Sequence, residues 1–137
     1  MGTGLLAFGE NVNMVDSMHH VAIVVEDVDE ALRFYRDALG LELKERRRVE
    51  AEDVEIAFLP LGESEIELLR PLSSESGVGR FLEKRGEGLH HICLAVDDID
   101  AAMERLQKAG AQVLGEKPQQ GADGTRYLFV HPKSAHG

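Results

Sequence analysis

Cysteine and tryptophan are scarce in this chain of 137 residues, which has one cysteine and no tryptophan. The single thiol, Cys93, excludes both an internal disulfide framework and a zinc cluster built from several thiolates. Cys93 lies inside the apolar run HHICLAV, so we expect a small buried core residue rather than a nucleophile.

Long apolar runs are also missing. No stretch approaches the roughly 18 residues of a membrane span. The N-terminal segment MGTGLLAFGENVN lacks both the basic start and the long apolar centre of a signal peptide. We therefore expect a cytoplasmic protein with no membrane partner.

Positive charge is in short supply, because 15 Lys and Arg stand against 25 Asp and Glu, for a formal net charge of -10. Affinity for nucleic acid comes largely from neutralising phosphates, so this balance argues against a nucleic-acid partner. The one basic cluster, Arg46 to Arg48, has two interpretations: a solvated strand edge, or a local contact to an anionic ligand.

The rest of the composition is that of an ordinary globular protein, with 43% hydrophobic and 29% charged residues. The length corresponds to about one domain. We expect residues 1–17 to form a flexible N-terminal extension and residues 18–137 to form a single domain.

The chain repeats one of its own segments. HHVAIVVEDVDEALRFYRDAL begins at His19 and HHICLAVDDIDAAMERLQKAG begins at His90, a shift of 71 positions. The shift also pairs His20 with His91 and places apolar residues opposite apolar residues along most of both copies. Such self-similarity indicates two equivalent structural modules.

Each copy begins with the alternating pattern of a strand and continues with the spacing of a helix. Asp27, followed by Glu30, and Asp98 are expected to cap the two helices at their starts. Gly40 and Gly110 are expected to end them. Strand-like segments follow each helix, three in the first copy and two in the second.

The predicted fold class is therefore α+β, with two tandem βαβββ modules at about residues 18–72 and 89–137. The same shift puts the counterpart of Glu67 at position 138, directly after the last residue of the chain. We therefore expect the final strand of the second module to be missing.

Two histidines occupy equivalent positions in the repeat. Because His20 and His91 lie on equivalent strands, a pseudo-twofold arrangement of the modules would bring both imidazoles to one site. Glu67 lies in SEIELL, on the side of its strand opposite to the apolar residues. Two imidazoles and a carboxylate suit a divalent metal ion with open positions, such as cobalt, manganese, nickel or zinc. His19 and His90 point the other way, and we expect them at the surface or supporting the ligands.

The repeat, together with EIELLRPL, LHHICLAVDDIDAA and HPKS, resembles the vicinal oxygen chelate superfamily and, within it, the family of methylmalonyl-CoA epimerases. The similarity extends from Met18 to Gly137. It implies a divalent metal ion, with cobalt expected first, held by His20, Glu67 and His91. The fourth ligand of the family is a glutamate on the final strand, which this chain does not contain.

The resemblance further implies an activity on a CoA thioester. The family inverts the stereocentre of methylmalonyl-CoA by removing the α-proton while the metal ion stabilises the enolate. Glu55 aligns with a glutamate proposed as a base in that family. Its neighbours Val54 and Ile56 are expected to face the core, so we expect Glu55 to face the site and to be catalytic. The resemblance also implies a homodimer, and without the fourth glutamate we expect the activity to be impaired.

Two other functions stay open. A glyoxalase I-type lyase has the same start of histidine, strand and helix, although HPKS and LHHICLAVDDIDAA favour the epimerase. A metal-free protein that binds or sequesters a small molecule can also use this fold. The presence of His20, Glu67 and His91 argues against the binder, because a binder has no need of metal ligands.

Overall fold

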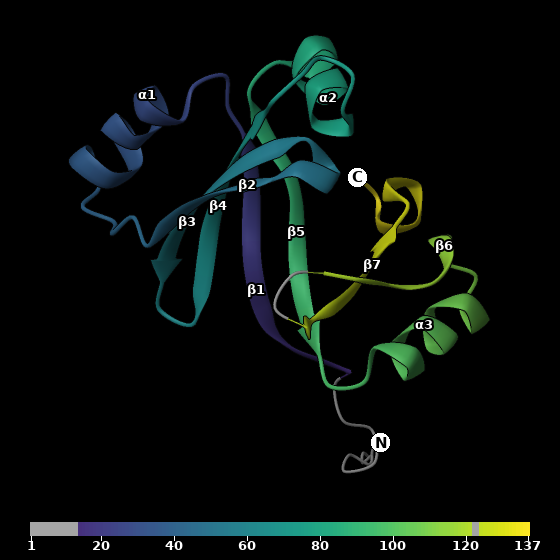
Figure 1. Ribbon diagram of the computed structural model, residues 1–137. Helices are drawn as coiled ribbons and strands as arrows, with labels where there is room; N and C mark the ends of the chain where they lie inside the picture. Colours follow the sequence, from purple (N-terminus) through teal and green to yellow (C-terminus); the bar gives the residue numbers. More distant parts are fainter. Residues whose placement is uncertain (1–13, 122–123) are drawn as a thin grey trace. The chain divides into compact units, whose positions relative to one another are not determined.

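The computed structural model describes residues 14–121 and 124–137 (Figure 1). The elements, in chain order, are β1 (Val15–Val24), α1 (Val28–Leu32), the π-helical η2 (Arg33–Ala38), β2 (Glu45–Val49), the 3-10 turn η3 (Glu50–Glu52), β3 (Val54–Leu61), β4 (Ser64–Pro71), α2 (Gly77–Arg85), β5 (Gly88–Val96), α3 (Ile99–Lys108), β6 (Val113–Gln120), β7 (Arg126–Val130) and the 3-10 turn η5 (Pro132–Ala135). This order agrees with the predicted α+β class: among the described residues, three strands (β2, β3 and β4) follow α1, and two (β6 and β7) follow α3, the helix of the second repeat copy.

The chain begins its first strand earlier than expected. β1 starts at Val15, ahead of the predicted domain start at residue 18. The remainder of the expected N-terminal extension, residues 1–13, lies outside the described residues. The described chain divides into two compact units, one of residues 17–95 and one that contains residues 96–137.

A five-stranded sheet forms the centre of the first unit, in the order β2-β3-β4-β1-β5. β1 and β4 are parallel, with Ala22 opposite Glu67, while β3 is antiparallel to both β2 and β4. β5, the counterpart of β1 in the sequence repeat, lies next to β1 in this sheet (Figure 1). The two strands that carry the paired histidines are therefore neighbours.

Both faces of this sheet carry apolar residues. On one face, Val28 and Leu32 of α1 pack with Leu59 and Leu68 of the sheet. On the other face, α2 packs against a second cluster of buried residues that includes Val24 and Leu69. Burial of these side chains is the main source of stability for the unit, because each fully buried aliphatic side chain contributes about 1.5–3 kcal/mol.

The two predicted helices have the predicted ends. The Asp27 carboxylate accepts the backbone N–H of Glu30 at 3.0 Å, and Asp98 accepts that of Ala101 at 3.0 Å. Gly40 and Gly110 follow the helical segments with φ of 80° and 87°, the left-handed conformation that favours glycine after a helix.

α2 was not predicted from the sequence. It begins after Ser76, whose side chain accepts the backbone N–H of Gly79 at 2.9 Å. Its segment has no counterpart in the repeat, and two glycines within its first turn weaken the helical signal.

The second unit joins α3 to the antiparallel pair β6 and β7. Ala102 and Met103 of α3 are buried. Arg126 of β7 donates two hydrogen bonds to the Asp100 carboxylate, at 3.2 and 2.9 Å, which ties the strand to the helix. No helix in the described part of the chain combines the length and the apolar character that crossing a bilayer requires.

Candidate active site

His20 of β1 and His91 of β5 meet in the structure. Their Nε2 atoms lie 3.2 Å apart, and both side chains are half-buried. The sheet brings them together because β1 and β5 are neighbours and the two histidines are equivalent in the repeat. The convergence inferred from internal symmetry is thus present in the fold.

Glu67 of β4 lies against the same pair. Its side chain shares a face of the sheet with His20, because Ala22, two residues after His20, is the register partner of Glu67. The Glu67 Oε2 atom is 3.2 Å from His20 Nδ1, and the residue is only 8% exposed. The three side chains predicted as metal ligands therefore gather on one face, with His20 in contact with both others.

Burial sets the charge of these groups. It raises the pKa of Glu67 to about 7, with the nearby carboxylates of Glu65 and Glu52 acting in the same direction. It lowers the pKa of both His20 and His91 to about 4, with neighbouring imidazoles adding to the effect. The imidazoles are therefore neutral at pH 7, and the contact between His20 and Glu67 is a polar contact rather than an ion pair.

The donor set fits a divalent metal ion. A neutral imidazole offers the lone pair that a metal ion needs. Two nitrogens bound at about 2.0–2.1 Å in tetrahedral geometry lie about 3.3 Å apart. The Nε2 atoms of His20 and His91, 3.2 Å apart, already have that separation, and the buried Glu67 carboxyl supplies an oxygen donor beside them.

Glu55 lies elsewhere, and the structure does not bring it to the predicted ligands. Glu55 pairs with Arg70 across β3 and β4, whereas Phe58 pairs with Glu67, so Glu55 and Glu67 face opposite sides of the sheet. Val54 and Ile56 are apolar like the residues around Glu67, but this sheet has an apolar cluster on each face. Apolar neighbours therefore did not reveal which side Glu55 faces.

Two arginines hold Glu55 on that other side. Arg70 Nε donates to one carboxylate oxygen at 3.0 Å and Arg46 Nε to the other at 3.2 Å. Arg46 also donates to Asp29 of α1 at 2.6 Å. Burial alone would raise the pKa of Glu55, but the hydrogen bonds from Arg46 and Arg70 outweigh it and hold the pKa below its ordinary value. An ionised carboxylate held in this way is a weak proton acceptor.

The same contacts account for the basic cluster of the sequence. Arg46 binds Glu55 and Asp29, Arg47 binds Glu45 at 3.0 Å, and Arg48 lies 3.6 Å from Glu50. Each arginine of the cluster faces a carboxylate of this chain, which favours the interpretation as a structural strand edge.

His19 and His90 extend the histidine pair at both ends. His19 Nδ1 is 2.9 Å from His20 Nδ1, and His90 Nδ1 is 2.8 Å from His91 Nδ1. His90 is half-buried against Phe81 of α2, with ring centroids 4.9 Å apart, whereas His19 is exposed. Alternation along the strands predicted that both would point away, either at the surface or supporting the ligands. His19 is exposed, and both rings lie within hydrogen-bond distance of a predicted ligand, as supporting residues would.

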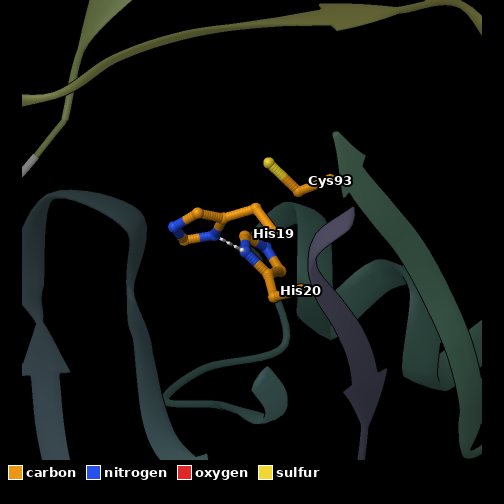
Figure 2. Close-up of side chains that lie close together, drawn as sticks. All are labelled: His19, His20 and Cys93. Carbon is orange, nitrogen blue, oxygen red and sulfur yellow. Dashed lines mark hydrogen bonds between the residues drawn. The ribbon is translucent and has the colours of Figure 1, made fainter. Parts of the chain in front are cut away.

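Cys93 lies close to this group as well. It comes from β5, it is half-buried rather than buried, and its sulfur lies near the imidazoles of His19 and His20 (Figure 2). Candidate ligand atoms of these three residues all lie within 4.8 Å of one another. Burial, and then the Glu67 carboxylate, raise the pKa of the thiol. The sequence could not show this grouping, because it depends on how β1 and β5 are placed side by side.

A cavity of about 610 Å³ opens beside His90. Its walls come from η3 and from the start of α2, and they include Glu52, Ser73, Ser76 and His90. Sequence reasoning missed this cavity because neither wall has a counterpart in the repeat. The one available signal was Ser76, a residue type that favours helix starts.

Comparison with known proteins places these residues in context. The profile of the glyoxalase/bleomycin resistance protein/dioxygenase superfamily matches residues 19–129. The chain is 44% identical to the ethylmalonyl-CoA/methylmalonyl-CoA epimerase of Cereibacter sphaeroides, over 90% of this chain and 94% of that protein.

Solved structures give the same picture. The methylmalonyl-CoA epimerase of Mycobacterium tuberculosis superposes with a TM-score of 0.84 at 32% identity, covering 97% of this chain and 87% of that one. A methylmalonyl-CoA epimerase in complex with methylmalonyl-CoA and NH4+ superposes with a TM-score of 0.83 at 35% identity, covering 90% of each chain.

Proposed function

Because this chain belongs to the glyoxalase/bleomycin resistance protein/dioxygenase superfamily, we propose that it is an isomerase that epimerises methylmalonyl-CoA with the help of a divalent metal ion. The observation that carries the proposal is the meeting of His20, His91 and Glu67 on one face of the sheet. The similarity to methylmalonyl-CoA epimerases supports a CoA thioester as the substrate class.

The reaction inverts the α-carbon, which lies between the thioester carbonyl and the free carboxylate. It removes the hydrogen of this carbon and returns a proton to the opposite face. His20, Glu67 and His91 would hold the ion, with cobalt as the first candidate and manganese, nickel or zinc as alternatives. When bound, the ion supplies Lewis acidity that stabilises negative charge on the oxygens of the enolate.

The residues of the chain prepare this site. The contact between His20 Nδ1 and Glu67 orients the ring and favours the tautomer whose Nε2, facing His91, carries the free lone pair. Burial keeps both imidazoles neutral and therefore able to act as ligands. The site is thus organised before the substrate arrives.

Proton transfer requires groups on the same side as the ligands. We assign it to the cavity beside His90, where Glu52 and His90 offer a carboxylate and an imidazole. Glu55, between Arg46 and Arg70, takes a positioning role, since it joins β2, β3 and β4 on the face turned to α1.

The proposal also covers the kind of substrate, the cellular location and the oligomeric state. A net charge of -10 agrees with a small-molecule substrate rather than nucleic acid. A cytoplasmic location is part of the proposal, as is a homodimer, which the family resemblance implies.

Loss of the α-hydrogen signal of methylmalonyl-CoA in deuterated water tests this function. We expect exchange with cobalt and none after the metal ion is removed. Propionyl-CoA is the matched control, because it has the thioester but lacks the second oxygen donor, and it should exchange far more slowly. Exchange that is indifferent to cobalt, or equal for both thioesters, would contradict the proposal. Ligand binding with no metal requirement would instead favour a binding protein.

A further inference from the structure

In the group of His19, His20 and Cys93, the proposed reaction uses His20 alone. His19 is exposed and His20 and Cys93 are half-buried, so the group is open to solvent on one side. Figure 2 shows the Cys93 sulfur on the side where the two rings lie. The three residues offer two imidazole nitrogens and one sulfur within 4.8 Å of one another.

The two nitrogens of His20 face different partners. Nε2 faces His91 at 3.2 Å, whereas Nδ1 faces His19 at 2.9 Å and Glu67 at 3.2 Å. The nitrogen that can share an ion with His19 is therefore not the one that faces His91. His20 lies between two distinct sets of donor atoms.

These two sets differ in chemical character. His20 and His91 offer nitrogens, with the Glu67 carboxyl as an oxygen donor against the His20 ring, whereas the group of His19, His20 and Cys93 adds a sulfur to its nitrogens. Thiolate ligands select zinc, cadmium and other thiophilic ions over harder cations. Zinc and cobalt sites of three protein ligands leave a fourth position for water.

We propose that His19, His20 and Cys93 form a second metal site, which binds a thiophilic divalent ion such as zinc or cadmium. The His19 and His20 Nδ1 atoms, 2.9 Å apart, need to separate slightly, and the sulfur needs to lie about 3.5 Å from each nitrogen for tetrahedral bonds with Zn–N near 2.0 Å and Zn–S near 2.3 Å. The exposed ring of His19 has the rotational freedom for that movement.

An ion in this second site excludes one in the first. A neutral imidazole carries one lone pair and one N–H, so an ion on Nδ1 of His20 leaves the proton on Nε2. His20 then cannot join His91 in holding the metal ion of the reaction. An ion bound in this second site would thus inhibit the enzyme, a consequence that rests on the proposed function.

Cadmium titration of the metal-free full chain tests the site itself. Cys93 is the single cysteine of the chain, so a thiolate-to-cadmium charge-transfer band in the ultraviolet reports this residue and no other. We expect a saturable band with one ion per chain, absent in Cys93→Ala. His19→Gln, at an exposed position, should weaken cadmium binding by about tenfold or more. His91→Ala is the matched control and should keep the band.

The result that would overturn the site is the absence of a band, or a His19→Gln variant with the cadmium affinity of the wild type. Activity gives a separate readout: cadmium should inhibit the cobalt-loaded enzyme, and His19→Gln should relieve that inhibition. A cadmium band without inhibition of the cobalt-loaded enzyme would contradict the inference that an ion in the second site excludes one in the first. If the epimerase assay fails, the cadmium titration still tests the second metal site, because the cadmium band does not depend on activity.

Discussion

At the scale of the residue, the sequence repeat located the paired histidines but not the direction of every side chain. His20 and His91 could be predicted because symmetry places equivalent strands together, and Glu67 because it alternates with the apolar Ile66 and Leu68. Glu55 was placed on the wrong side because the sheet packs apolar residues on both faces. Alternation shows that neighbouring side chains face opposite sides, but not which side faces the site.

Glu67 makes the stability of the metal-free chain depend on pH. Its pKa of about 7 in the folded state lies above the value of 4.5 for an unperturbed carboxyl. The folded state therefore keeps a proton that the unfolded state has lost, so this contribution to stability is present below pH 4.5 and is lost as pH rises to 7. His20 and His91 act in the opposite direction, because their lowered pKa values disfavour folding below pH 6.5.

Glu67→Gln removes only the contribution of the carboxyl. We therefore expect the free energy of unfolding of Glu67→Gln, relative to that of the wild type, to be higher at pH 7.5 than at pH 5. The gain should be on the order of 2 kcal/mol. Urea unfolding at both pH values, with a chelator present, measures it. Glu65→Gln serves as the control and should show a smaller difference. A Glu67→Gln variant whose stability relative to the wild type is the same at both pH values would contradict the assigned protonation.

At the scale of the element, the repeated strands and helices could be predicted, whereas α2 and η3 could not. The repeated elements show the same pattern twice, with capping aspartates and terminal glycines in register. α2 occurs once, and one of its glycines, Gly79, reflects close packing rather than a break in the helix. A methyl group at Gly79 would collide with the backbone of Ser73 and Ser74, whereas one at Gly77 would meet nothing.

Two substitutions in the same helix should therefore have opposite effects. Gly79→Ala should lower the free energy of unfolding by about 1–3 kcal/mol, because the added methyl forces the backbone of Ser73 away. Gly77→Ala should leave it unchanged or raise it by about 0.4–1 kcal/mol, because it reduces the entropy of the unfolded chain. Thermal or urea unfolding measures both. Equal effects of the two substitutions would show that α2 does not pack on this segment.

At the scale of the whole molecule, the family and the fold class could be read from the sequence, and the cavity could not. The family follows from motifs along the chain, and the superfamily profile matches residues 19–129. The cavity depends on η3 and α2 coming together beside His90, which no local pattern encodes. The central claim is that the chemistry takes place on the face of the sheet that carries His20, Glu67 and His91.

The most direct test compares one substitution on each face. α-Proton exchange of methylmalonyl-CoA in deuterated water, with cobalt, would be measured for the wild type, His91→Ala and Glu55→Gln, each confirmed as folded by circular dichroism. We predict that His91→Ala lowers the exchange rate by about 100-fold or more, because it removes a metal ligand. Glu55→Gln should stay within about threefold of the wild type. Exchange that survives in His91→Ala and vanishes in Glu55→Gln would contradict the account and place the chemistry on the opposite face.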